Sequence, residues 1–226
     1  MKICLIGDFS GTPDEGMKNI SRTTYEFISS KHEVLVLTGR TILQPSVIRR
    51  FIAFRPGIVH YLHGPTIRSL AMLKVLQSIP GQKIKTVVSA TRPYFSRVTR
   101  PLVRLLKPDL VLTQSEKFER FFQKHGCRVA FLPNGVDCHK FAPVDPGVKK
   151  RLRRKYGLPL DKKIVLHVGH IKQNRNLSLF SEIQKISGVQ VVVVGGTVEK
   201  SDNDLKTRMM NAGVKVIHRY LNDISE

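Results

Sequence analysis

FLPNGVDCHKFAP, residues 131–143 of the 226-residue chain, reads as the end of a strand that runs into a Pro-Asn-Gly turn. Pro133 fixes φ and Gly135 tolerates positive φ, so the strand cannot continue through them, and further prolines follow within a few residues. We therefore predict a change of domain at this point. The predicted parts are a first domain over 1–143, a basic linker or helix over 144–162, and an incomplete second domain over 163–226.

On both sides of this stretch, apolar runs alternate with segments of helical periodicity. Strands are expected over 2–6, 32–38, 58–62, 85–89, 110–113, 128–132, 164–168, 190–194 and 214–217. Helices are expected over 17–30, 67–77, 115–125, 176–186 and 202–212. Strands that alternate with helices indicate an α/β fold with Rossmann-like, doubly wound parallel sheets.

The chain is strongly basic, with 38 Lys and Arg against 17 Asp and Glu, a net charge of +21. Such a field favours polyanions: nucleic acid, an anionic membrane surface or a phosphate-bearing substrate. The three cysteines form no CxxC pair, which indicates reduced, mostly buried thiols in a cytoplasmic protein. No run of apolar residues reaches the length of a membrane span, and no His/Cys cluster has metal-ligand spacing, so no metal is expected.

A phosphate site is predicted where two loops follow strands and lead into helices. Gly16 begins one helix, and the loop 169–176 precedes the other and contributes His170, Lys172 and Arg175. Helix N-termini and guanidinium groups are natural partners of a diphosphate. A solvated loop is the alternative, and the glycine spacing near residue 16 disfavours a dinucleotide site.

Two histidines flank Tyr61 and Leu62. His60 shares a strand face with Leu62 and is expected in the core, whereas His63 lies just past the strand and is an acceptor-side candidate. No pair of carboxylates stands out for acid–base chemistry, so no catalytic residue is assigned.

The segment 92–107 interleaves basic residues with aromatic and leucine residues. Its cations recur at helical spacing, which indicates one basic helix face for an anionic membrane surface, although Pro101 limits how continuous that helix can be. A solvated face is the alternative. The candidates are Arg97, Arg100, Arg104 and Lys107.

Three motifs, TQSE (113–116), LPNGVDCHKFAP (132–143) and VGHIKQNRNL (168–177), together resemble family 4 of the nucleotide-sugar glycosyltransferases. The resemblance implies the GT-B fold, with the acceptor on the first domain and the donor mainly on the second. It also implies retaining transfer from a nucleotide-diphospho-sugar without a metal, to an acceptor that is lipid-linked in some members. A peripheral position on the inner face of the cell membrane would fit such an acceptor.

The resemblance also assigns residues. His170 and Arg175 stand where the family has an arginine and a lysine that hold the donor diphosphate, and Gly16 would lie near it. Thr91 stands where a cleft histidine is common, so that role is not carried over; Thr91 and Arg92 join His63 only as acceptor-side candidates. The glycines expected to let the nucleotide approach are Gly169, Gly195 and Gly196.

The family's Glu-rich motif would lie beyond Tyr220, so the chain is expected to be a fragment of such an enzyme. Two alternatives stay open. One is a basic Rossmann-like module that binds nucleic acid, and the other is a non-catalytic remnant or subunit that another chain completes.

Overall fold

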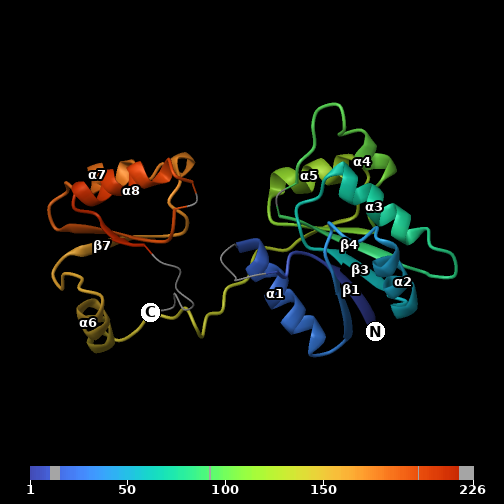
Figure 1. Cartoon of the computed structure of the whole chain (residues 1–226), viewed down its shortest axis with the longest axis horizontal. Coiled ribbons are helices and arrows are strands. Elements are labelled where there is room, and N and C mark those ends of the chain that lie inside the picture. The colour runs from blue at the N-terminus through green and yellow to red at the C-terminus, as the bar shows by residue number, and fades with distance from the viewer. Residues whose placement is uncertain (11–15, 92, 198, 219–226) are drawn as a thin grey trace. The chain divides into compact units, whose positions relative to one another are not determined.

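The computed structural model describes residues 1–10, 16–91, 93–197 and 199–218, and these fold into two units (Figure 1). The first unit spans Met1–Gly135 and the second Val136–Glu226. The boundary between them falls within the Pro-Asn-Gly stretch, eight residues before the end of the predicted first domain at residue 143.

The first unit contains a six-stranded, all-parallel sheet in the order β2-β1-β3-β4-β5-β6. Its strands are β1 (Lys2–Ile6), β2 (Glu33–Leu37), β3 (Ile58–Tyr61), β4 (Lys85–Ala90), β5 (Leu110–Thr113) and β6 (Val129–Phe131). Its helices are α1 (Gly16–Ser29), α2 (Pro45–Phe54), α3 (Ile67–Gln77), α4 (Leu102–Leu105) and α5 (Glu116–Lys124).

Helices cover both faces of this sheet. Alternate residues of β1 enter different clusters, because successive side chains of a strand point to opposite faces. Cys4 and Ile6 pack with α2, α3, α4 and α5, whereas Ile3 and Leu5 pack with Leu62 and with Ile28 of α1. Figure 1 shows α3, α4 and α5 on one side of the sheet and α1 on the other. The doubly wound α/β prediction is confirmed.

The second unit has a three-stranded parallel sheet in the order β7-β8-β9. Its elements are α6 (Pro146–Lys155), β7 (Lys163–Val168), the 3₁₀ turn η1 (Gln173–Arg175), α7 (Leu179–Ile183), β8 (Val189–Val194), α8 (Asp202–Asn211) and β9 (Lys215–Ile217). Its core joins Val191 and Val193 of the central strand to Leu205 and Met209 of α8. Figure 1 shows α7 and α8 side by side over the sheet.

Three helices differ from the expectation. α2 is not predicted, although Pro45 stands at its start, where proline is favoured. The helix expected over 176–186 shrinks to Leu179–Ile183, because Asn176 adopts a left-handed conformation (φ 55°) and separates η1 from α7. Only Leu102–Leu105 is helical in the basic segment, and this helix begins directly after Pro101, the residue expected to limit its length.

The predictions for His60 and for the three cysteines are confirmed. His60 pairs with Leu5 in the sheet register and its Nε2 lies 2.9 Å from Ser89 Oγ, while burial lowers its pKa to about 4. Cys4 and Cys127 are buried, Cys138 is exposed, and all three thiols are free. No helix among the described residues is long and apolar enough to cross a membrane.

Candidate functional site

In the second unit, the loops that follow β7 and β8 remain paired beyond the ends of their strands. The amide of Gly169 donates to Val194 O at 2.9 Å, and that of Ile171 donates to Gly196 O at 2.9 Å. A bridge between Ile171 and Thr197 extends the parallel pairing further. The carboxyl edge of this sheet, where open α/β folds bind ligands, is therefore an ordered backbone surface.

Two glycines make this surface possible. Gly169 and Gly195 have φ values of +146° and +153°, which side chains other than hydrogen rarely allow. A Cβ atom at Gly195 would lie 2.0 Å from the carbonyl oxygen of Gly169. A Cβ atom at Gly196 would meet nothing within 4 Å. The two loops thus touch backbone to backbone at Gly195, with open space beside Gly196.

Positive charge lies over this backbone surface. Nη1 of Arg175 would be 2.8 Å from a Cβ atom at Gly169, so the exposed guanidinium group covers that glycine. Beneath it, Nε2 of His167 is buried and has no hydrogen-bond partner among the described residues. Burial and the nearby Arg175 lower the pKa of His167, against a hydrogen bond to the His170 backbone. The low pKa of His167 disfavours its charged form, and Arg175 supplies a positive charge beside it.

Asp202, which the sequence analysis does not single out, connects the two loops. The residue is 3% exposed, and its carboxylate accepts hydrogen bonds from the amides of Gln173 (3.3 Å) and Glu199 (3.1 Å). It begins α8 and so also faces the positive end of that helix. In the sequence, Asp202 is recognisable only as an aspartate at the start of a predicted helix. Aspartates at that position usually stabilise the helix start and do not indicate a contact between loops.

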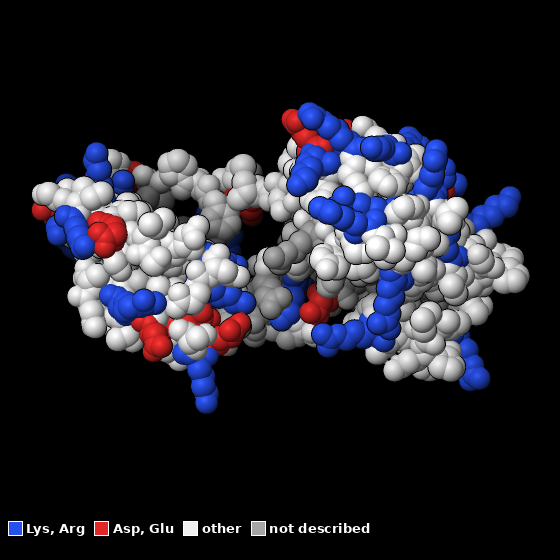
Figure 2. Space-filling model, turned by 90° about the horizontal axis from the view of Figure 1, so that it is seen from above, with Lys and Arg blue, Asp and Glu red and all other residues white. Residues whose placement is uncertain are grey.

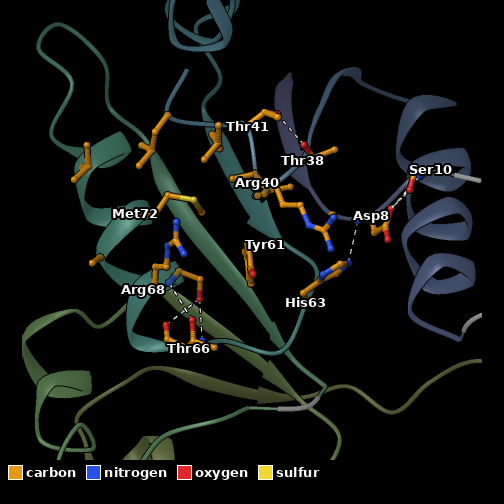
Figure 3. A pocket seen from close by; sticks show the side chains of 18 residues that line it. Asp8, Ser10, Thr38, Arg40, Thr41, Tyr61, His63, Thr66, Arg68 and Met72 are labelled. Atoms are coloured by element: carbon orange, nitrogen blue, oxygen red, sulfur yellow. Dashed lines mark hydrogen bonds between the residues drawn. The ribbon is translucent and has the colours of Figure 1, made fainter. Parts of the chain in front are cut away.

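The first unit carries a cavity of about 840 Å³ at the carboxyl ends of β1, β2 and β3 (Figure 3). His63 lines it, and its Nε2 accepts a hydrogen bond from the amide of Asp8 at 2.9 Å. This bond places the proton of the neutral ring on Nδ1. Burial lowers the pKa of His63, although the Asp8 carboxylate opposes the shift. The Asp8 carboxylate accepts in turn from Ser10 N (3.0 Å) and Oγ (2.6 Å).

Thr91 and Gly16 are not among the described residues that line this cavity. Thr91 is half-buried just after β4, and its hydroxyl donates to Met17 Sδ of α1 at 3.5 Å. Arg92 lies outside the described residues. Gly16 is the exposed first residue of α1, with no neighbour within 4 Å of a Cβ position, so it has no described contact with a site.

The basic segment after β4 forms a small aromatic cavity and a surface of exposed basic and apolar side chains. Arg100 and Lys117 line a small cavity of about 250 Å³ with Phe95, Phe118 and Phe121. Tyr94, Val98 and Leu105 are highly exposed, at 77%, 87% and 75%. The other cations of the segment, Arg97, Arg104 and Lys107, are exposed as well. Figure 2 shows Lys and Arg side chains scattered over this face of the first unit.

No group of three or more His, Cys, Asp or Glu residues in the described part of the chain has an arrangement that could hold a metal ion. The two carboxylates described above each accept two hydrogen bonds from donors of the protein itself. The two sites offer guanidinium, imidazole, carboxylate, hydroxyl and backbone amide groups.

Comparisons with known proteins find solved structures with a similar fold but no protein with a clearly similar sequence. No family model matches the chain. No curated protein matches it either. Among solved structures, Anabaena HepE in complex with UDP and glucose is 17% identical, with a TM-score of 0.67 over 100% of this chain and 71% of that one. A glycosyltransferase from Rickettsia africae is 14% identical, with a TM-score of 0.67 over 99% and 69%.

A third structure, a trehalose-6-phosphate protein from E. coli bound with UDP-2-fluoro glucose, is 8% identical, with a TM-score of 0.58 over 98% of this chain and 74% of that one. At such low identities the likeness speaks for the fold alone. It extends over both units. The chain has an α/β, GT-B-like fold with Rossmann-like parallel sheets.

Proposed function

We propose that the chain is a glycosyltransferase, or a piece of one, that takes a sugar from a nucleotide-diphospho-sugar. The observation that carries the proposal is the contact of Gly169 with Gly195 beneath the guanidinium group of Arg175. This contact fixes the two loops, and it places a cation next to the open space beside Gly196, at the edge where such folds bind ligands. The structures of HepE with UDP-glucose and of the E. coli protein with UDP-2-fluoro glucose support a UDP-sugar as the first donor to test.

The proposed chemistry follows from charge. As the sugar leaves, negative charge grows on the diphosphate, and a preorganised guanidinium group stabilises it more than it stabilises the ground state. Arg175 takes this role, Gly169 and Gly195 let the two loops pack backbone to backbone, Gly196 leaves open space for the phosphates and nucleoside, and His170 adds one N–H donor. We further propose, on the family resemblance, that transfer retains the anomeric configuration and needs no metal.

The first test is the affinity of the chain for UDP and for UDP-, GDP- and ADP-sugars, measured by titration calorimetry. Arg175→Ala is expected to weaken binding of the preferred nucleotide by about 1.5–3 kcal/mol, the range for a charge-assisted hydrogen bond. The matched control is Arg208→Ala, which removes the same charge from the exposed last turn of α8. That variant should bind like the unmodified chain. Equal affinity of the Arg175 and Arg208 variants would remove Arg175 from the site.

We also propose that the first unit binds an anionic membrane surface, which would place the enzyme on the cytoplasmic face beside a lipid-linked acceptor. The support is the combination of Arg97, Arg100, Arg104 and Lys107 with the exposed apolar side chains of Tyr94, Val98 and Leu105. Each cation near an anionic bilayer contributes about 1 kcal/mol, and apolar side chains can enter the interface.

Replacing Arg97, Arg100 and Arg104 by glutamine should therefore abolish sedimentation with phosphatidylserine-containing liposomes at physiological salt. A control with Lys149, Lys150 and Arg151 replaced by glutamine loses the same charge from α6 of the second unit. If both triple variants sediment equally, the net charge of the chain accounts for binding and the assigned surface is wrong.

A further inference from the structure

The cavity of the first unit is lined by two arginine side chains that have no partner among the described residues. Arg40, from the loop after β2, and Arg68, from the first turn of α3, both line it. Neither guanidinium group has a hydrogen bond or ion pair with another described residue, and both side chains are exposed. The acidic group of the lining, Asp8, already accepts two hydrogen bonds from Ser10. The lining therefore carries two guanidinium groups against one carboxylate, and neither guanidinium group is paired with it.

The two ends of the cavity differ in chemistry. Figure 3 shows Asp8 and His63 together at one end and Arg68 beside Met72 on α3 at the other, with Tyr61 between them. Arg68, Met72 and Val75 are spaced three and four residues apart, so they lie on one face of the helix. Met72 is 8% exposed, whereas Val75 is 56% exposed.

Exposed apolar side chains also line the cavity. Val75 and Leu43, which is 57% exposed, both line the cavity, and Leu43 comes from the same loop as Arg40. A purely polar ligand would leave these side chains in water. A ligand with an apolar part next to an anionic group would cover them while it binds Arg68.

We propose that this cavity binds the acceptor and that the acceptor carries an oxyanion, a phosphate ester or carboxylate. The oxyanion binds Arg68, and any apolar part lies against Met72, Val75 and Leu43. Arg40, which Figure 3 shows on the side of Asp8 and His63, adds positive charge to the cavity as a whole. A hydroxyl group of the acceptor lies at the other end, within the reach of the Asp8 carboxylate and of Nδ1–H of His63. This assignment rests on the proposed transferase function, and it adds the chemical class of the acceptor.

Two probes test the proposal on the full chain by titration calorimetry: glycerol 3-phosphate and monomeric dihexanoyl phosphatidic acid. At least one should bind, and Arg68→Gln should weaken it about tenfold or more, as expected for loss of a charge-assisted hydrogen bond. Arg128→Gln is the matched control, because Arg128 is exposed and precedes β6 at the opposite, amino-terminal edge of the parallel sheet. It should leave the affinity unchanged.

The two probes also separate the sources of the oxyanion. Binding of both with similar affinity indicates a soluble phosphate ester, and preference for the phosphatidic acid indicates a lipid headgroup. Binding of neither probe, or equal weakening by Arg68→Gln and Arg128→Gln, overturns the proposal. UDP affinity, measured on the same samples, separates this proposal from that of the donor site. If UDP binds and neither probe does, only the cavity assignment is refuted. If a probe binds and UDP does not, only the donor assignment is refuted.

Discussion

Gly195→Ala is expected to abolish measurable UDP binding and to destabilise the second unit by about 2–4 kcal/mol, within the range of the most disruptive single substitutions. The added methyl group would lie 2.0 Å from Gly169 O, and its φ of +153° is itself unfavourable for alanine. The clash is with backbone, so no side-chain rotation can relieve it. The loops after β7 and β8 would have to separate, and the surface under Arg175 would be lost.

The neighbouring glycine provides the control. Gly196→Ala adds the same methyl group one residue along, where nothing lies within 4 Å. Denaturant titration should show unchanged stability for this variant, and any loss of UDP affinity would then report direct occupation of that space by the ligand. If Gly195→Ala unfolds at the same denaturant concentration as Gly196→Ala, the close contact of the two loops does not exist in solution.

Asp202→Ala should destabilise the second unit by about 2–4 kcal/mol, because the amides of Gln173 and Glu199 would each lose a partner at roughly 1–3 kcal/mol. The loss should also weaken UDP binding, since η1, which carries Arg175, is held by the Gln173 contact. Asp202→Asn keeps one acceptor oxygen and should fall between the alanine variant and the unmodified chain.

Asp204→Ala is the matched control for this prediction. Asp204 lies in the same first turn of α8, is exposed, and forms no contact with the loops. Its removal costs only the interaction of a carboxylate with the helix start, about 0.3–1 kcal/mol. Equal destabilisation by the two alanine variants would mean that Asp202 acts only as a helix cap and does not connect the loops.

The sequence predicts the fold well because regular elements depend on local patterns. Buried strands such as Lys2–Ile6 and the helix Ile67–Gln77 have clear apolar runs or periodicity, and a capping box from Thr66 and Ser69 fixes the start of that helix. Where a single backbone angle decides, as with the left-handed Asn176, periodicity predicts a helix that the structure replaces with η1 and a shorter α7.

The site is less predictable because it depends on contacts across the sheet. Gly169 and Gly195 are 26 positions apart, and only the parallel register brings them together. Arg40 was identifiable in principle, since it follows a predicted strand at the same edge as His63. The chain has many other Lys and Arg residues that are equally plausible in the sequence, and only its position in the cavity distinguishes Arg40 from them.

The separate cores described above determine how the chain responds to denaturant. The cluster around Phe51 and Phe122 belongs entirely to the first unit, and the cluster around Leu205 and Met209 entirely to the second. Each cluster is made of side chains from one unit, so each unit can unfold on its own. Two-state treatment of the unfolding of the whole chain is therefore unjustified. Stability changes at Gly195 or Asp202 belong to the second transition, and those in the oxyanion cavity to the first.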